Sequence, residues 1–374
     1  MPNPLQRLAD FGQSVWYDNI SRAVLQDGSL AALVAAGEVH GVTSNPAIFE
    51  KAIGGGAEYD ADIRRHKADG RGRDATYEAL AISDILAGAD VLRPVFDRTA
   101  GADGYISLEV APGLAADTAG TIADALRLRG LLPRPNIMIK IPATPAGWPA
   151  IEAATAEGLC INVTMMFALS HYARVADSYM RGLERRLAKG QDIRGIHSVA
   201  SVFVSRFDVL IDRVLEQKIA AAGTESERGR LQALLGRSAL ANAKLTYARF
   251  RETFAGPRWG KLAAAGANLQ RPLWASTSTK NPAYRDVLYA EQLIGPDTVD
   301  TMPPQTIAAF RDHGAVARTV DAGLPEARQT IAELQAVGID LEDVGVRLQN
   351  DGVAAFATAF EKMLQELDTK ARGL

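Results

Sequence analysis

The sequence predicts an α/β protein in which eight parallel strands alternate with helices and close into a (β/α)8 TIM barrel, with extra helices and a helical C-terminal tail. Short runs rich in β-branched residues alternate with long amphipathic stretches, and this alternation recurs eight times. Within the runs, apolar side chains occupy every second position, as strands between two layers require. Repeated right-handed crossovers favour closure of such a sheet into a barrel.

The eight strands are expected in chain order, separated by helices. The expected strands cover residues 14–20, 41–46, 105–110, 137–142, 159–164, 198–204, 272–277 and 298–303. The clearest expected helices cover 76–100, 121–132 and 171–190; extra helix is expected within 210–254, and three more helices from about 304 to 374. No linker rich in Gly, Ser or Pro interrupts the chain, so residues 1–374 are expected to form a single domain.

Composition excludes several classes of function. The 41 basic and 44 acidic residues give a net charge of −3 without a basic block, which argues against a nucleic-acid partner. The lone Cys160 cannot form an internal disulfide, and no apolar run reaches the ~18 residues of a membrane span. With no signal-peptide pattern at the start, the expected location is the cytoplasm. The five histidines have no ligand spacing, so neither metal nor cofactor is expected.

Strand parity predicts a cluster of polar side chains inside the barrel. Residues 137, 139 and 141 are all Ile and suit the helix layer, which leaves Lys140 facing the lumen. The same alternation turns further polar residues inward near the carboxyl ends of other strands: Asp18, Asn45, Glu109, Asn162 and Thr164. Barrel enzymes build their sites at that end. The alternative is a set of unrelated polar residues, each satisfied by a loop.

A lysine in an apolar strand suits covalent chemistry. Burial penalises its ammonium form, and the neutral amine can attack a carbonyl to form a Schiff base. That route needs proton carriers but no metal, and Glu109 and Asp18 on separate strands could supply them. A third interpretation makes Lys140 and Glu109 a purely structural ion pair.

Three other features of the sequence have a candidate role in binding or catalysis. Arg206 and Lys280 follow two late strands and could bind a phosphate at the mouth, although each could equally form a surface salt bridge. The glycine-rich stretch 52–60 lacks the lysine and hydroxyl of a phosphate-binding loop and is expected to be a flexible loop. Cys160 is expected to fill the barrel rather than act as a nucleophile.

Several motifs together resemble the transaldolase family, in its longer bacterial form. They are "GVTSNPAIFEKAI", "ISLEVAP", "IKIPAT", "CINVTMMF" and "RPLWASTSTKNPAY". The resemblance implies a barrel of the class I aldolase type and a transferase of the non-oxidative pentose phosphate pathway. The implied reaction moves a dihydroxyacetone unit from sedoheptulose 7-phosphate to glyceraldehyde 3-phosphate, giving erythrose 4-phosphate and fructose 6-phosphate. Sugar phosphates are then the partners, with a homodimer as a possible assembly.

The resemblance also implies roles for single residues. Lys140 matches the Schiff-base lysine, Asp18 the acid/base of carbon–carbon cleavage, and Glu109 the glutamate that acts through a water that Thr164 helps to hold. The implied binders of substrate hydroxyls are Asn45, Asn162 and Ser201. Arg206 matches a phosphate-binding arginine, whereas Ser278 and Lys280 fall where shorter forms have a serine and a second phosphate-binding arginine.

Two alternative functions stay open. Fructose 6-phosphate aldolases of the same superfamily resemble transaldolases but release dihydroxyacetone, and they characteristically carry Gln at the position of Glu109 and Tyr at that of Phe203. Both residues here favour the transferase, because a phenyl ring cannot position a water through a hydroxyl. A sugar-phosphate-binding barrel without catalysis would keep Arg206 and Lys280 but would gain nothing from Lys140.

Overall fold

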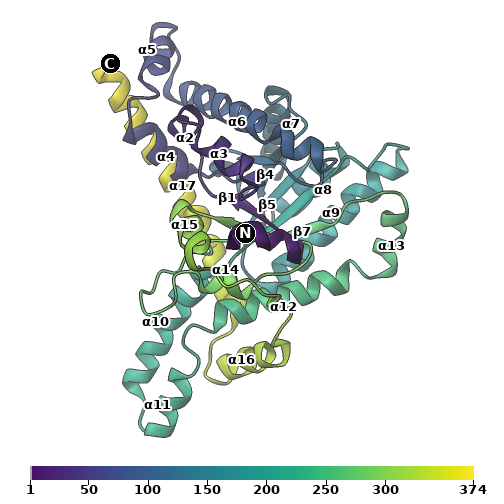
Figure 1. Cartoon of the computed structure of the whole chain (residues 1–374), viewed down its shortest axis with the longest axis vertical. Coiled ribbons are helices and arrows are strands. Elements are labelled where there is room, and N and C mark those ends of the chain that lie inside the picture. Colours follow the sequence, from purple (N-terminus) through teal and green to yellow (C-terminus); the bar gives the residue numbers. More distant parts are fainter. Residues whose placement is uncertain (1) are drawn as a thin grey trace.

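The computed structural model describes residues 2–374, and among them eight parallel strands form a closed barrel in the order β1 to β8 (Figure 1). The predicted (β/α)8 barrel is confirmed. Its strands are β1 Gln13–Tyr17, β2 Gly41–Val42, β3 Ile106–Glu109, β4 Ile137–Pro142, β5 Ile161–Met166, β6 Ser198–Phe203, β7 Gln270–Ala275 and β8 Thr298–Met302. β1 pairs with both β2 and β8, which closes the sheet.

Helices surround the barrel and extend beyond it. Up to β5 they are α1 Pro4–Arg7, α2 Arg22–Gln26, α3 Ser29–Ala35, α4 Pro46–Gly55, α5 Asp60–Ala68, α6 Arg73–Arg98, α7 Thr118–Leu131 and α8 Gly147–Ala156. After β5 come α9 Leu169–Ala188, α10 Ser205–Ala221, α11 Glu225–Gln232, α12 Ser238–Thr253, α13 Pro257–Ala264, α14 Leu288–Gln292, α15 Pro304–His313, α16 Leu324–Ala336 and α17 Leu341–Gly373. The extra helix expected within 210–254 and the three helices expected in the tail are therefore confirmed.

The strand register shows which predicted side chains lie on the same side of the sheet. Lys140 lies opposite Glu109 of β3 and Asn162 of β5, so the three side chains share the lumenal side of the sheet. The register between β5 and β6 then shifts between Val163 and Met166. Such a bulge re-aims the side chains beside it.

The prediction of a second strand over residues 41–46 is mostly wrong. β2 ends at Val42 instead of running to residue 46, because Asn45 caps α4 and Pro46 occupies the first helical turn. The Asn45 side chain accepts a hydrogen bond from the Ile48 amide at 3.0 Å, and proline fits where a helix needs no amide donor. The chain therefore turns directly from the barrel into a helix at this point.

The glycine-rich stretch 52–60 is only partly a loop. α4 continues to Gly55, and α5 begins at Asp60, so the expectation of a loop was wrong for its first half. Glycine is a poor helix former, but α4 packs extensively against α17, and this tertiary packing outweighs the propensity.

The last helix, α17, lies across the carboxyl end of the barrel (Figure 1). Its Gln349 amide donates hydrogen bonds to the carbonyls of Ala143 and Met165, both at 2.9 Å, which fastens the helix to the ends of β4 and β5. A Cβ at Gly352 would lie 3.0 Å from the sulfur of Met165, so glycine permits the close approach. The tail is thus part of the barrel mouth.

Candidate active site

Lys140 stands near the carboxyl end of β4 with 5% of its surface exposed. Its Nζ donates to the Ser44 carbonyl at 3.0 Å and lies 3.1 Å from Oε2 of Glu109. The ring of Phe356, from α17, lies 5.6 Å from Nζ and covers it. The lysine is therefore held by one carbonyl and one carboxylate, beneath an aromatic wall.

Glu109 is the last residue of β3, and its carboxyl group faces Lys140. Burial raises its pKa, and the neighbouring Lys140 opposes that effect. The ion pair between Lys140 and Glu109 that the sequence suggested is present, but it does not exclude catalysis. The 3.1 Å between the two groups is short enough for a proton to pass from one to the other.

Asp18 directly follows β1 and lies on the same side of the barrel as Lys140. Its Oδ1 accepts a hydrogen bond from the Thr43 hydroxyl at 2.7 Å, and Thr43 Oγ1 lies 2.6 Å from that of Thr301. Burial raises the pKa of Asp18; the Thr43 hydrogen bond opposes this most, followed by the charges of Lys140 and Lys280. Two threonines thus orient a carboxyl group that takes up a proton readily.

The hydroxyl of Thr164 is buried, and no group among residues 2–374 forms a hydrogen bond with it. Thr164 lies on β5 and lines the same cavity as Lys140. A buried polar atom without a partner is costly unless a ligand or water satisfies it. The arrangement fits a hydroxyl that holds a water or a substrate oxygen.

Asn162 occupies a different place from the one expected. Its Nδ2 donates to Ser107 Oγ at 3.0 Å, and its Oδ1 accepts from Ser201 Oγ at 2.7 Å. Asn162 is fully buried and does not line the cavity, whereas Ser201 does. In this structure Asn162 orients Ser201, while Asn45 uses Oδ1 for its helix cap and lines the cavity.

Two cationic side chains, Arg206 and Lys280, line the cavity. The Arg206 guanidinium lies 5.2 Å from the ring centroid of Phe203, and burial lowers its pKa without an opposing carboxylate. Burial also lowers the pKa of Lys280, followed by the charge of Arg206, while Asp18 opposes both. The Lys280 ammonium donates to the Ser278 hydroxyl. Two cations so placed suit a dianionic phosphate.

One cavity of about 230 Å³ brings these groups together. Its predicted members are Asp18, Asn45, Lys140, Thr164, Ser201, Phe203, Arg206, Ser278 and Lys280. Glu109 touches Lys140 but lines a neighbouring cavity instead.

Sequence reasoning missed other members of this cavity. They include Thr43, Ser276, Thr301, Gln305 and Phe356. Thr43 shares the lumenal parity of Asn45, which could have identified it. The strained backbone of Ser276, with φ of +57°, leaves no mark on the sequence. Phe356 comes from a helix whose partner the sequence does not reveal.

Metal-binding clusters, membrane-spanning helices and a reactive cysteine would each indicate another kind of function for residues 2–374. No group of three or more His, Cys, Asp or Glu side chains is placed to hold a metal ion. None of the helices in this range is both long and apolar enough to cross a membrane. Cys160 lies before β5, where its sulfur accepts a hydrogen bond from the His197 amide, and burial raises the pKa of its thiol.

Comparison of the chain with known proteins identifies its family. The model of the transaldolase/fructose-6-phosphate aldolase family matches residues 15–367. The chain belongs to this family. It is 47% identical to Transaldolase 1 of Streptomyces avermitilis, over 99% of this chain and 96% of that protein. It is 46% identical to the transaldolase of Thermobifida fusca and 42% identical to that of Trichodesmium erythraeum, each covered over 98% of its length.

Proposed function

We propose that the chain is a transaldolase that transfers a dihydroxyacetone unit between sugar phosphates through a Schiff base on Lys140. The observation that carries this proposal is the buried Lys140–Glu109 pair, 3.1 Å apart, with Asp18 on the same cavity wall. A nucleophile, a proton carrier for imine formation and a separate base for cleavage are the groups that this chemistry needs. The curated relatives named transaldolase support the same reaction.

Imine formation uses the Glu109 carboxyl group to carry protons between nitrogen and oxygen. Neutral Nζ attacks the C2 carbonyl of the donor; the C–N bond forms, and a proton passes from nitrogen to oxygen by way of the Glu109 carboxyl group. Glu109 in its acid form then protonates the resulting hydroxyl. The C–O bond breaks, water departs, and the nitrogen lone pair forms the iminium C=N bond beside the Glu109 carboxylate.

Cleavage uses the other carboxyl group. Asp18 takes the proton of the C4 hydroxyl, the C3–C4 bond breaks as the C4–O double bond forms, and the bonding electrons move to the iminium nitrogen. An aldehyde leaves and the three-carbon enamine stays on Lys140. The reverse steps with another aldehyde form the product, and water hydrolyses the final imine.

Phosphate binding by the cationic side chains of the cavity fixes the substrate's direction. Arg206 and Lys280 hold the phosphate, while Asn45 and Ser201 hold hydroxyl groups between it and Lys140. Lysine at position 280 supplies charge without the two-pronged geometry of arginine, so Arg206 provides the directional contact.

Two residues favour transfer over release of dihydroxyacetone. Phe203 has no hydroxyl with which to orient a water onto the enamine, and its ring packs against Phe167 at a centroid distance of 5.2 Å. Glu109 stands where the resemblance implies glutamine in the aldolases. The family description covers both activities, so these positions and the relatives' names support the choice.

A coupled assay tests the proposal. Glyceraldehyde 3-phosphate released from fructose 6-phosphate is converted by coupling enzymes that oxidise NADH, with and without erythrose 4-phosphate. A signal that requires erythrose 4-phosphate supports the transaldolase. A comparable signal without it indicates the aldolase, and no signal in either case contradicts both activities.

The whole chain is proposed to act as a single domain, because α17 supplies Phe356 to the cavity that the barrel strands form. The homodimer and the cytoplasmic location expected from the sequence stay predictions.

A further inference from the structure

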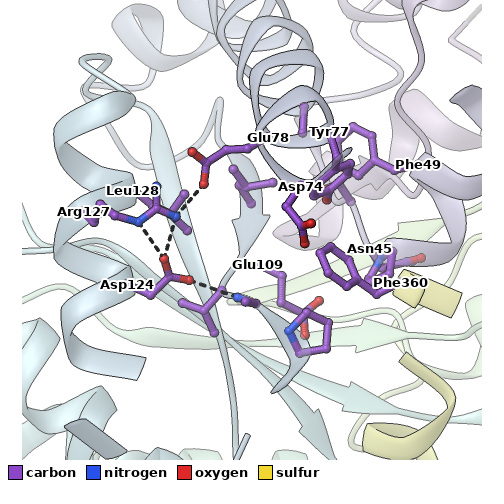
Figure 2. A pocket seen from close by; sticks show the side chains of 17 residues that line it. Asn45, Phe49, Asp74, Tyr77, Glu78, Glu109, Asp124, Arg127, Leu128 and Phe360 are labelled. Atoms are coloured by element: carbon purple, nitrogen blue, oxygen red, sulfur yellow. Dashed lines mark hydrogen bonds and ion pairs between the residues drawn. The ribbon is translucent and has the colours of Figure 1, made fainter. Parts of the chain in front are cut away.

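Behind the substrate cavity lies a second cavity of about 200 Å³, between the barrel and helices α4, α6, α7 and α17. Figure 2 shows Glu109 among its lining residues, between the Asp124–Arg127 pair and the rings of Phe360 and Tyr77. Only Asn45 lines both cavities. Glu109 is thus reached from this side cavity, although it contacts Lys140.

The walls of the side cavity are aromatic and apolar near Glu109. Tyr77 packs edge-to-face against Phe49 at 5.8 Å and against Phe360 at 5.2 Å. Burial raises the pKa of Tyr77, and the charge of Glu109 raises it further, which keeps its hydroxyl protonated. Ala81 of α6 completes the wall.

The outer rim of the side cavity is charged. Asp74, with 74% of its side chain exposed, lines this rim. Arg127 forms ion pairs with Glu78 and Asp124 and so links α6 to α7. Asp124 also accepts a hydrogen bond from the Ala111 amide at 3.0 Å. The charged rim and the Glu109 carboxyl group, whose Oε2 has no hydrogen-bond partner among residues 2–374, offer a water polar partners at the two ends of the apolar passage.

We propose that the side cavity is the route by which water leaves and reaches Glu109 during imine formation and hydrolysis. This inference rests on the proposed function. A sugar phosphate bound between Arg206 and Lys140 fills the substrate cavity and blocks that exit. The water lost from C2 departs beside Glu109, and the side cavity joins this group to solvent. The same path returns a water when the product imine is hydrolysed.

The origin of one oxygen atom tests the route. Ordinary fructose 6-phosphate and erythrose 4-phosphate react in H₂¹⁸O, and mass spectrometry follows the C2 oxygen of the first sedoheptulose 7-phosphate formed. If released water escapes, this oxygen comes from solvent; if water is trapped, the donor's own oxygen returns. The retained fraction is a ratio within the product, so it does not depend on the amount of active enzyme. A reaction without enzyme corrects for spontaneous exchange.

Two variants narrow the route at different depths. Ala81→Leu fills the passage, and Asp74→Trp covers the rim at an exposed position that tolerates a large side chain. Their matched controls on the same helix are Ala87→Leu and Ala75→Trp, at exposed positions that do not line the cavity. Neither variant changes a group that touches the reacting atoms.

We expect the wild type and both controls to incorporate solvent oxygen almost completely. In the two narrowed variants the retained fraction should rise by at least about fivefold, because a buried water without an exit stays on its polar partners. Two results would overturn the route. One is a retained fraction of donor oxygen equal to that of the wild type in a folded Asp74→Trp and Ala81→Leu double variant. The other is a wild-type enzyme that already retains the donor oxygen. If Ala81→Leu does not fold, Asp74→Trp alone decides. Absence of sedoheptulose 7-phosphate from the wild type would instead refute the proposed function itself.

Discussion

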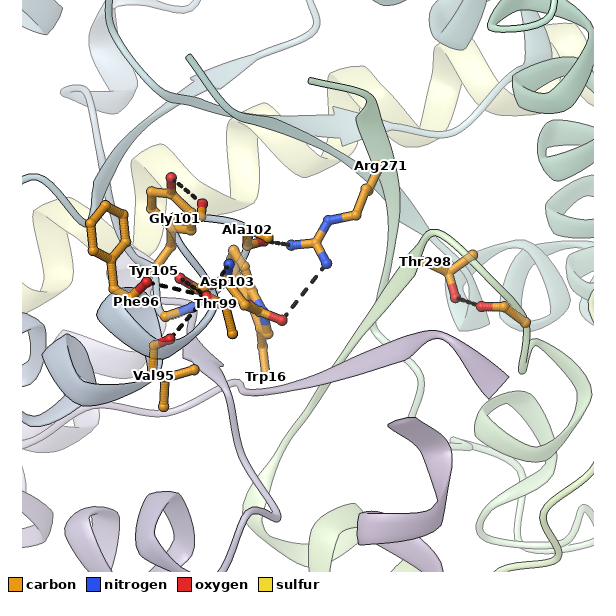
Figure 3. A network of polar contacts seen from close by, with 12 residues as sticks. Trp16, Val95, Phe96, Thr99, Gly101, Ala102, Asp103, Tyr105, Arg271 and Thr298 are labelled. Atoms are coloured by element: carbon orange, nitrogen blue, oxygen red, sulfur yellow. Dashed lines mark hydrogen bonds and ion pairs between the residues drawn. The ribbon is translucent and has the colours of Figure 1, made fainter. Parts of the chain in front are cut away.

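The two ends of the barrel both carry buried polar side chains, but they use them in opposite ways. At the amino-terminal end, Asp103 accepts hydrogen bonds from the Trp16 indole at 2.9 Å and the Gly104 amide at 3.1 Å, and Arg271 lies 3.7 Å away (Figure 3). Thr99 accepts from the Asp103 amide at 3.0 Å. These groups are satisfied by one another, and the network ties β1, β3 and β7 together.

At the carboxyl end, polar and charged side chains instead gather around a cavity. Thr164 Oγ1 has no partner within residues 2–374, burial raises the pKa of both Asp18 and Glu109, and the half-buried Arg206 forms no ion pair within the same range. Buried polar groups of this kind cost stability. Buried polar atoms without a partner also occur at the amino-terminal end, at Gln13, His40 and Gln270. The comparison therefore teaches that polar and charged groups gathered around a cavity, rather than unpaired polar atoms alone, mark the end that binds substrate.

The same substitution, Asp to Asn, should affect the two ends of the barrel differently, and the largest expected effect is on catalysis at the carboxyl end. Asp18→Asn should lower kcat by about 10²–10⁴-fold, because the base for carbon–carbon cleavage is lost. Imine formation should persist, so borohydride should still attach fructose 6-phosphate to the protein. Steady-state kinetics and mass spectrometry of the reduced adduct measure the two steps. Cleavage at the wild-type rate would show that another group acts as the base.

The cationic side of the mouth should respond through binding. Arg206→Met should raise KM for fructose 6-phosphate by about 10–100-fold, since a charge-assisted hydrogen bond to the phosphate is lost. Lys280→Arg keeps the charge and serves as the control, with KM within a few-fold of the wild type. Initial-rate kinetics give both values, and an unchanged KM in Arg206→Met would remove Arg206 from the phosphate site.

The amino-terminal end should respond through stability alone. Asp103→Asn should lower the free energy of unfolding by about 1–3 kcal/mol, because the Trp16 and Arg271 partners lose a charged acceptor. We expect kcat to stay close to the wild type. Urea unfolding and steady-state assays check the two halves of the statement. A fall in kcat as large as that of Asp18→Asn, without loss of stability, would break the contrast between the ends.

A pH-dependent effect on stability concerns Asp300 of β8, whose pKa burial raises to about 7 while a hydrogen bond from Thr277 opposes the shift. The folded state therefore holds a proton that the unfolded state releases at lower pH, so stability falls as pH rises from about 4 to about 7. Asp300→Asn should remove this pH dependence, which amounts to no more than about 4 kcal/mol in the free energy of unfolding. The gain in Tm over the wild type should be larger at pH 8 than at pH 5. An equal change at both would contradict the assigned protonation.

Strand periodicity predicted the barrel and the lumenal side of Lys140, Glu109 and Asp18 because a two-residue repeat is local information. Register then brought Lys140 beside Glu109, as parity implied. The early end of β2 depended on a competition between strand pairing and the helix cap of Asn45. Sequence pattern identified both elements but could not decide where one ended.

The rest of the site depends on packing between elements distant in sequence, which the sequence pattern does not reveal. The apolar spacing of Phe356 and Phe360 indicates a buried face on α17, but not that Phe356 covers Lys140 while Phe360 borders the side cavity. Asn162 has the predicted parity, yet hydrogen bonds to Ser107 and Ser201 keep it out of the cavity. Such partners become known only when elements distant in sequence are placed together.

The most direct test of the central claim is to identify the residue that forms the imine. Protein incubated with fructose 6-phosphate is reduced with borohydride, digested and examined by peptide mass spectrometry, with Lys140→Met as the control. We expect one adduct, on Lys140, with loss of activity in proportion to labelling, and neither adduct nor activity in Lys140→Met. An adduct on another lysine such as Lys280, or turnover that survives in Lys140→Met, would contradict it.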